Sequence, residues 1–343
     1  MKTYTEVIEY LRKNNRQHHL LIGNGFSISY DKDIFSYNAL SRFLMDGDNV
    51  TLKNVFNVFN TQNFELVMEQ LDNFVAVSKV LKFPSGCNKQ LEDVAKQLKD
   101  SLIEAVSAMH PEQVFEIPEE NSAACARFLN EYLQNGGNVF STNYDLLLYW
   151  VMMRNEQHPT DGFGREAENV GYGEYVQEDD IEWSELIWGK HKKDQNVHYL
   201  HGSLPLFDTG TEIIKEEYDG TWILDKIKKR MEKGHFPIFV TAGDAAQKMK
   251  HISHNKYLTY CYDSLCNIEG SLITFGFSFG DNDTHIIDAI NRAAKHGQRR
   301  GDRLLSIYVG VFSEADLAHM QSIESKFECK VNYFDAKTAN IWR

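Results

Sequence analysis

The chain has 343 residues, which is enough for one large domain or two of ordinary size. Hydrophobic residues make up 42%, charged residues 25% and aromatic residues 12%, a mixture that excludes a disordered chain. The formal net charge of -13 repels phosphate backbones and anionic lipid, so nucleic-acid binding and a membrane-surface role are disfavoured.

The five cysteines are odd in number and scattered, and no Cys-x-x-Cys pair occurs. This usage predicts reduced thiols, no structural zinc and no other tightly bound metal. Residues 1–17 are a charged amphipathic segment rather than an apolar signal sequence. No run approaches the roughly 18 apolar residues of a membrane helix. We therefore expect a cytoplasmic protein.

A helix over residues 3–14 is predicted to lead into a buried strand near 18–22. The strand runs straight into Gly23 and Gly25, which the hydroxyl of Ser27 follows. Glycines at such a turn can take positive φ, so that successive N–H groups form an anion nest. The stretch is a candidate phosphate-binding loop.

The glycine pair is a weak motif by itself. Ile28 stands where the dinucleotide fingerprint has its third glycine, and the absence of a following Gly-Lys-Ser/Thr excludes a P-loop. An ordinary tight turn after a core strand explains the same residues. Three later strands that also end in polar residues favour the functional interpretation.

A long helical stretch separates the first of these strands from the second. Residues 63–81, 91–109 and 121–134 carry apolar residues at helical spacing. We expect a helical insertion over 38–135 that flanks the nucleotide pocket. The alternative is that these are large crossover helices of the sheet.

A strand at 138–142 ends in Thr142, Asn143 and Asp145, and a buried helix follows to residue 154. One turn thus offers an amide and a carboxylate. Helix capping by Asp145 and a turn role for Asn143 explain either residue taken alone. Residues 155–196, rich in glycine and acids, are predicted to form a lid-like loop.

A strand at 197–201 brings His201 to the same edge. His198, three residues earlier, must point to the opposite face, so the two histidines cannot chelate one metal. A lone histidine at a strand end is more often a surface residue. His201 becomes a candidate general base because imidazole titrates near neutrality and other strand ends should lie nearby.

The rest of the chain alternates between predicted helices and strands. Helices are expected at 222–233, 244–252, 255–267, 283–296 and 314–326, and strands at 237–241, 271–275, 303–310 and 329–334. This alternation predicts an α/β, Rossmann-like doubly wound parallel sheet in a single domain over 1–343. The carboxyl ends of its strands should gather along one edge, where ligands bind.

Four motifs in this order resemble the core of the sirtuin family. They are Gly23-Asn24-Gly25-Phe26-Ser27, Ser141-Thr142-Asn143-Tyr144-Asp145, Leu200-His201-Gly202 and Gly276-Phe277-Ser278. The resemblance covers residues 19 to about 290 and is strongest to the bacterial sirtuin-like proteins of anti-phage and abortive-infection systems.

The resemblance implies a role for each matching residue. The glycine stretch, with Asn24, Phe26 and Ser27, would bind the pyrophosphate of NAD. Asn143 and Asp145, with Thr142 beside them, would position the nicotinamide ribose and a nucleophile, and His201 would be the catalytic base. Gly276 and Ser278 would lie by the adenosine ribose. Apart from the resemblance, Asp283, in the acidic stretch that begins the next helix, would accept hydrogen bonds from ribose hydroxyls, unless it only caps the helix.

Two features of the sirtuin family that this sequence lacks limit which second substrate the reaction can use. The four-cysteine zinc ribbon and the peptide-binding stretch of the protein-deacylating sirtuins are not found, so acetyl-lysine is a poor second substrate. Water remains as the nucleophile, which implies an NAD glycohydrolase that serves anti-phage defence. Such an enzyme would be toxic to its own cell, so we expect control by homo-oligomerisation or by a regulatory protein.

Two other classes stay open. Gly276 to Gly280 matches the Gly-x-Ser-x-Gly elbow of serine hydrolases, with Asp302 or Asp316 and His319 as the remaining triad. A non-catalytic nucleotide sensor or oligomerising scaffold would use the same pocket. The presence of both Asn143 and His201 argues against that class.

Overall fold

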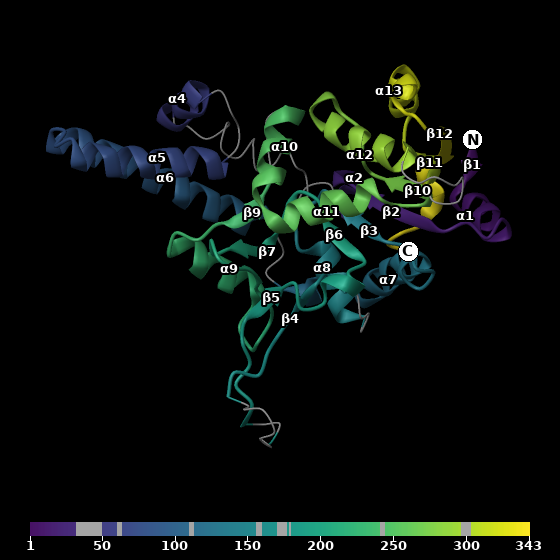
Figure 1. Ribbon diagram of the computed structural model, residues 1–343, viewed down its shortest axis with the longest axis horizontal. Helices are drawn as coiled ribbons and strands as arrows, with labels where there is room; N and C mark the ends of the chain where they lie inside the picture. The colour runs from purple at the N-terminus through teal and green to yellow at the C-terminus, as the bar shows by residue number, and fades with distance from the viewer. Residues whose placement is uncertain are drawn as a thin grey trace.

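The computed structural model describes residues 1–31, 50–59, 64–109, 113–155, 160–169, 177, 180–240, 244–295 and 303–343. Its centre is a sheet of parallel strands in the order β1-β12-β11-β10-β2-β3-β6 (Figure 1). The seven strands are β1 (Lys2–Thr3), β2 (His18–Ile22), β3 (Val139–Ser141), β6 (Val197–Tyr199), β10 (Gly270–Phe275), β11 (Leu304–Val311) and β12 (Lys330–Asp335). The predicted Rossmann-like doubly wound α/β fold is confirmed, and only the short edge strand β1 was not expected.

Helices cover both faces of this sheet, which explains why β2 and β10 are buried along their whole length. Figure 1 shows one set of helices on each face. One face carries α1 (Tyr4–Lys13), α7 (Glu119–Leu133) and α8 (Leu147–Arg154); the other carries α11 (Lys256–Cys266), α12 (Thr284–Lys295) and α13 (Glu314–Ile323). The predicted helices and strands around this sheet therefore occur in the expected order.

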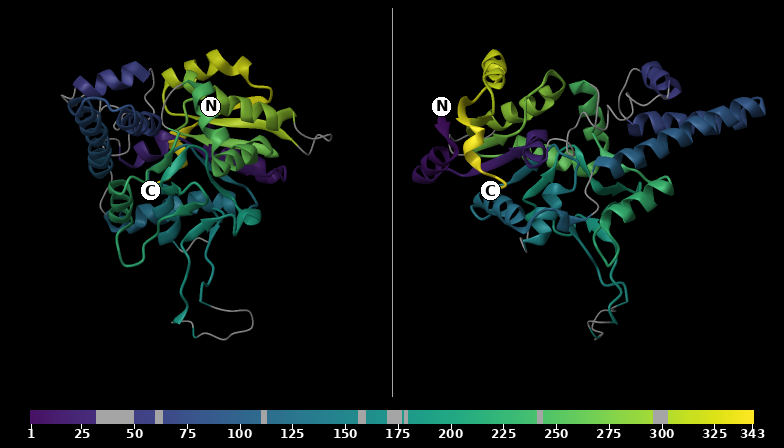
Figure 2. Two further views of the ribbon diagram at one scale, coloured as in Figure 1. Left: turned by 60° about the vertical axis from the view of Figure 1, so that its left-hand side comes forward. Right: turned by 180° about the vertical axis from the view of Figure 1, so that it is seen from behind.

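Three helices occupy the described part of the predicted helical insertion before α7. They are α4 (Val50–Phe59), α5 (Phe64–Val80) and α6 (Ser85–Met109). Helices α5 and α6 run side by side and project from the body of the protein (Figures 1 and 2). Residues 38–49, 60–63 and 110–112 of the insertion lie outside the described residues. Whether the insertion flanks a nucleotide stays a prediction.

A second, antiparallel sheet adjoins the end of β6, and the sequence did not reveal it. Its order is β4-β5-β8-β7-β9, and its strands are β4 (Phe163–Gly164), β5 (Leu186–Trp188), β7 (Gly202–Asp208), β8 (Ile213–Lys215) and β9 (Pro237–Phe239). The assignment of 237–241 to the parallel sheet was therefore wrong. Alternation along the chain reports a strand but not its partner, and strands of three residues carry little pattern.

The predicted lid is partly built into this second sheet. Strand β4 pairs with β5, and a bridge joins Ala167 to Trp183 farther out. The described residues beyond these strands extend away from the central sheet (Figures 1 and 2). They do not cover the strand ends.

Two more helices lie near the second sheet. Helix α9 (Ile223–Glu232) packs on β7, and α10 (Ala245–His254) packs on α11 and α12. Asp244 begins α10 with a capping box to Gln247. In the described part of the chain, no helix is long and apolar enough to cross a membrane.

Candidate functional site

The strand order defines where a ligand site is expected. Without the edge strand β1, and numbered along the chain, the parallel strands follow the order 3-2-1-4-5-6 of the Rossmann fold. The chain leaves β2 toward β3 and β6, and later leaves β10 toward β11 and β12. The topological switch point is thus between β2 and β10, and the four resembling motifs follow β2, β3, β6 and β10.

The glycines at this switch point allow close backbone packing rather than a nest. Gly23 has φ -123° and precedes α2 (Asn24–Tyr30), so Gly25 belongs to the first turn of a helix. A Cβ on Gly25 would lie 2.6 Å from the Cα atom of Gly276. The positive φ is instead at Gly276, 66°. The expected loop with positive φ at Gly23 and Gly25 was wrong.

The N–H groups of these glycines already have partners. Gly23 donates to the carbonyl of Phe275 at 3.0 Å, and Gly25 donates to the carbonyl of Gly276 at 2.8 Å. The two motifs therefore hold each other across the β2–β10 pair. Other residues predicted to bind the nucleotide differ in access: Asn24 is partly exposed, whereas Phe26 is buried against Trp342. A direct contact from the Phe26 side chain to a nucleotide is not possible in this conformation.

Ser27, Asn143 and Asp145 form a buried polar cluster between the ends of β2 and β3. The Oγ atom of Ser27 donates to Oδ2 of Asp145 at 2.6 Å and accepts from Nδ2 of Asn143 at 2.9 Å. The other oxygen of Asp145, Oδ1, accepts the backbone N–H of Leu147 at 2.9 Å, in the first turn of α8. Thr142 lies beside the cluster and donates to the carbonyl of Ile22. We refer to Ser27, Asn143 and Asp145 as the carboxylate cluster.

Burial changes the acidity of this cluster. It raises the pKa of Asp145 from 3.8 to about 6, although the bonds from Ser27 and from the backbone of Leu147 act to lower it. Asp145 is therefore ionised at neutral pH but close to its midpoint, as a general base or a stabiliser of developing positive charge requires. The capping role also holds, because Asp145 accepts the Leu147 N–H.

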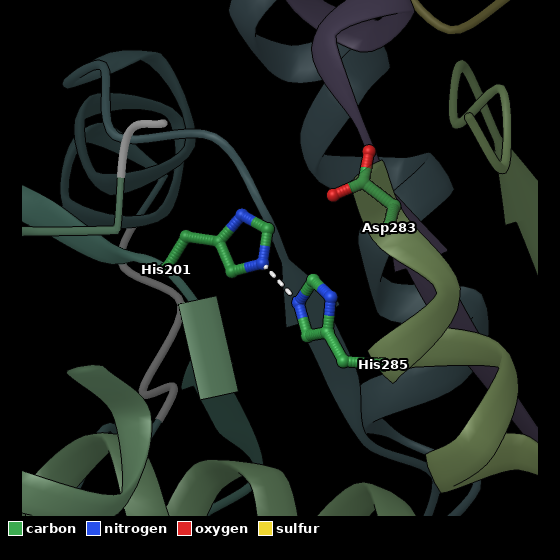
Figure 3. Close-up of side chains that lie close together, drawn as sticks. All are labelled: His201, Asp283 and His285. Carbon is green, nitrogen blue, oxygen red and sulfur yellow. Dashed lines mark hydrogen bonds between the residues drawn. The ribbon is translucent and has the colours of Figure 1, made fainter. Parts of the chain in front are cut away.

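His201 follows β6 and meets a histidine from the opposite half of the fold. Its Nε2 atom lies 2.9 Å from Nε2 of His285, in the first turn of α12 (Figure 3). The two rings are nearly parallel, with centroids 5.1 Å apart. Strands β6 and β10 are separated in the sheet by β2 and β3. The pair therefore reaches across both central strand ends.

Both imidazoles of this histidine pair are neutral near pH 7. Burial lowers the pKa of His201 well below 6.5, and His285, Lys248 and His251 lower it further. Burial likewise lowers the pKa of His285 to about 4, opposed by Asp283. A neutral imidazole can accept a proton, which the expected role of His201 requires.

Asp283 stands near the histidine pair but has a cationic partner. One ligand atom each from His201, Asp283 and His285 lie within 4.8 Å of one another, a set that could hold a metal ion. However, Lys248 of α10 donates to Oδ1 of Asp283 at 2.6 Å with its side chain buried. Asp283 is therefore paired with an ammonium group as well as lying near the two histidines.

His198 lies away from this pair, as the strand periodicity predicts. Its ring stacks on Phe140 with centroids 4.9 Å apart, and Gln195 contacts its Nδ1. It cannot share a ligand with His201.

The serine-hydrolase alternative has little geometric support. Ser278 is exposed, and among the described residues no hydrogen bond joins it to His319, whose Nε2 lies 3.4 Å from the carbonyl of Phe279. Asp316 accepts the backbone N–H of Ser313 in the capping box of α13. Asp302 lies outside the described residues.

Sequence reasoning missed His285 and Lys248. His285 follows Asp283 by two residues in a stretch that was interpreted only for its acids. A histidine in the first turn of a helix that follows a candidate strand end is the signal that was available. Lys248 belongs to a helix after the second sheet, and no sequence pattern connects it to Asp283.

Comparison with known families gives one match. The family model described as a domain of unknown function, DUF4917, matches residues 20–342, which is nearly the whole chain. No curated protein matches the chain.

Proposed function

The chain belongs to the DUF4917 family, and we propose that this protein is an NAD glycohydrolase that cleaves the nicotinamide–ribose bond. The observation that supports this most is the arrangement at the strand ends. Asn143 and Asp145 adjoin the switch point of a Rossmann-like sheet, and His201 follows the next strand. The resemblance to sirtuin-like NAD-consuming hydrolases supports the same reaction.

The cleavage needs little acid catalysis. Nicotinamide leaves a cationic riboside as a neutral molecule, so departure requires no proton. As the C–N bond breaks, positive charge develops on the ribose, and in this proposal the negative charge of the buried Asp145 carboxylate stabilises it. Water then forms the new bond to the ribose carbon. His201 takes the proton that the water loses, and the products are nicotinamide, ADP-ribose and one proton.

The amide of Asn143 has a separate role in this proposal. Its Nδ2 donates to Ser27, which fixes the plane of the amide. Its Oδ1 has no hydrogen-bond partner among the described residues, so it can orient the attacking water or a ribose hydroxyl.

Few hydrogen-bond donors are left to bind the pyrophosphate of NAD. The backbone N–H groups of Gly23 and Gly25 are used within the protein, and Ser27 is buried in the carboxylate cluster. The partly exposed Asn24 remains at this turn, and the glycines leave no side chain over the backbone. A nucleotide sensor or scaffold that binds without turnover, the second candidate, would depend on the same few donors.

Control of the activity is part of the proposal. A free NAD glycohydrolase would deplete its own cytoplasm, so we propose regulation by self-association or by a regulatory protein, in a defence response to phage. Light scattering with and without NAD would show whether the chain self-associates when the nucleotide is bound.

The reaction is tested by incubating the purified full chain with NAD in water enriched in ¹⁸O. Mass spectrometry should find nicotinamide and ADP-ribose in equal amounts, with the label in ADP-ribose, because water is the nucleophile. Tight binding of NAD without either product would favour the sensor. Turnover of an ester substrate that Ser278→Ala abolishes would favour the serine hydrolase.

A further inference from the structure

The contact between His201 and His285 joins two segments that are far apart in the chain. His201 follows β6, whereas His285 lies in α12, and their Nε2 atoms are 2.9 Å apart. Both side chains are buried, and the carbonyl of His285 accepts a hydrogen bond from the Tyr262 hydroxyl at 3.0 Å. The backbone of His285 is thus anchored independently of its ring.

The groups around the pair keep both rings neutral near pH 7 before a proton is taken up. Lys248 and His251, both on α10, lower the pKa of His201, and Lys248 also lowers that of His285. Asp283 acts in the opposite direction on His285, but its carboxylate is bound to Lys248. Between two neutral imidazoles one Nε2 must carry the proton and the other must accept it.

The ring nitrogens that do not take part in this bond differ. Nδ1 of His285 is fully buried and has no hydrogen-bond partner among the described residues. Nδ1 of His201 has no partner there either, but it is not fully buried. In Figure 3 the second ring nitrogen of His201 points away from His285. Since Nε2 is engaged, Nδ1 is the nitrogen of His201 that a water or substrate can approach.

We propose that His285 is a positioning residue: its Nε2 accepts the Nε2–H of His201, so that the lone pair of His201 is held on Nδ1. The inference rests on the proposed function, because it assumes that His201 accepts a proton from water. When Nδ1 takes that proton, His201 becomes an imidazolium that keeps its bond to His285. The bond then has a charged donor and is stronger than between neutral rings.

This arrangement puts an N–H on the unpartnered nitrogen of His285, which costs free energy. If its Nε2 accepts, its proton must be on Nδ1, where no acceptor exists among the described residues. A buried N–H without a partner is rare and calls for a functional reason. Here the reason is that the other side of the ring must remain an acceptor.

Two variants of His285 distinguish its role as a hydrogen-bond acceptor from its role in packing. His285→Gln keeps a neutral acceptor at about the reach of Nε2, whereas His285→Leu keeps the volume and removes the acceptor. Both retain the backbone carbonyl that Tyr262 binds. We expect kcat/KM for NAD cleavage to fall ~10²-fold in His285→Leu, the lower range for losing a positioned base, and less than ~10-fold in His285→Gln. Equal loss in both variants, or parent activity in His285→Leu, would overturn the proposal.

The tautomer provides a test that needs no turnover. Nitrogen NMR of the ¹⁵N-histidine-labelled full chain, with the His201 signals assigned from the His201→Asn variant, should show His201 protonated at Nε2 and bare at Nδ1. Protonation at Nδ1 would overturn the proposal even if His285→Leu fails to fold, and so would stoichiometric zinc in the purified protein. The expected tautomer in a protein that binds but never cleaves NAD would reject the proposed function and retain this hydrogen bond.

Discussion

The carboxylate cluster and the histidine pair solve the problem of a buried polar group in opposite ways. In the cluster, each oxygen of Asp145 accepts a hydrogen bond, and burial favours its protonated form. In the pair, burial favours the unprotonated form of both rings, and Nδ1 of His285 has no partner in the part of the chain that the structure describes. Hydrogen bonding is therefore nearly complete in the carboxylate cluster and incomplete in the histidine pair.

The origin of the two groups in the chain differs as well. Asn143 and Asp145 lie in one turn, and their partner Ser27 follows the neighbouring strand. His201 follows β6, whereas His285 lies in α12 after β10, and these two strands are not neighbours. Their contact therefore depends on the placement of α12 over the strand ends. A reaction that needs both groups therefore depends on the whole sheet edge.

The largest expected effect is the loss of activity when either group is broken. His201→Ala and Asn143→Ala should each reduce kcat for NAD cleavage by ~10² to 10⁴-fold, because one removes the base and the other the dipole that orients water. Steady-state kinetics would measure this. Ser278→Ala, the matched control, should raise KM with little change in kcat. Circular dichroism must first show that the variants fold.

The glycine contact between β2 and β10 supports both groups and should be intolerant of a side chain. In Gly276→Ala, a Cβ would lie 2.4 Å from the backbone nitrogen of Phe26, at a positive φ. We expect a loss of about 2 to 5 kcal/mol in the free energy of unfolding. Gly86→Ala in α6 meets nothing within 4 Å and should be neutral or stabilising. Urea denaturation that finds the two variants equal would contradict the close contact.

The stability contributions of Asp145 and His285 should change in opposite directions as the pH falls. The pKa of Asp145 is about 6 in the folded protein, above its ordinary 3.8, so the folded state binds the proton more tightly than the unfolded state. The contribution of Asp145 to the free energy of unfolding therefore falls as pH rises from about 4 to 6. The folded pKa of His285, about 4, is below 6.5, so this residue lowers stability as pH falls through the same range. Removing Asp145 therefore leaves the histidine effect unopposed.

Asp145→Asn should accordingly lose more stability than the parent between pH 7 and pH 4.5, by on the order of 2 kcal/mol. Chemical denaturation at the two pH values measures the difference, and the remaining carboxylates cancel in the comparison. An identical pH dependence in parent and variant would show that Asp145 titrates at its ordinary pKa.

The smallest expected effect concerns the bond inside the carboxylate cluster. Ser27→Ala removes a hydrogen bond that lowers the pKa of Asp145. The acid limb of the kcat/KM profile should move upward by about one pH unit, since bonds to charged groups contribute about 1.5 to 3 kcal/mol. An unchanged limb would assign the profile to another group.

Most of the parallel sheet could be predicted from the sequence. The strands 18–22, 271–275 and 303–310 are short, mainly apolar segments between amphipathic helices, and the structure has them as β2, β10 and β11. The second sheet could not be predicted, because β4, β5, β8 and β9 have only two or three residues each. Pairing of such short strands is decided by tertiary contacts.

The candidate site likewise has a part that could be predicted from the sequence and a part that could not. Asn143, Asp145 and Ser27 follow two strand ends that were predicted to lie along the same edge of the sheet, and the structure makes these two strands neighbours. The helical conformation at Gly25 was not predicted, because the close packing against Gly276 depends on a residue far along the chain. Lys248 was missed for the same physical reason, whereas His285 carried a local signal that was interpreted only for its neighbouring acids.

The most direct test of the account is the release of nicotinamide from NAD by the parent protein and by folded His201→Ala under the same conditions. The account predicts nicotinamide and ADP-ribose in equal amounts from the parent, and a rate at least ~10²-fold lower from the variant. Cleavage by folded His201→Ala at the parent rate would contradict the central claim that His201 takes the proton from water.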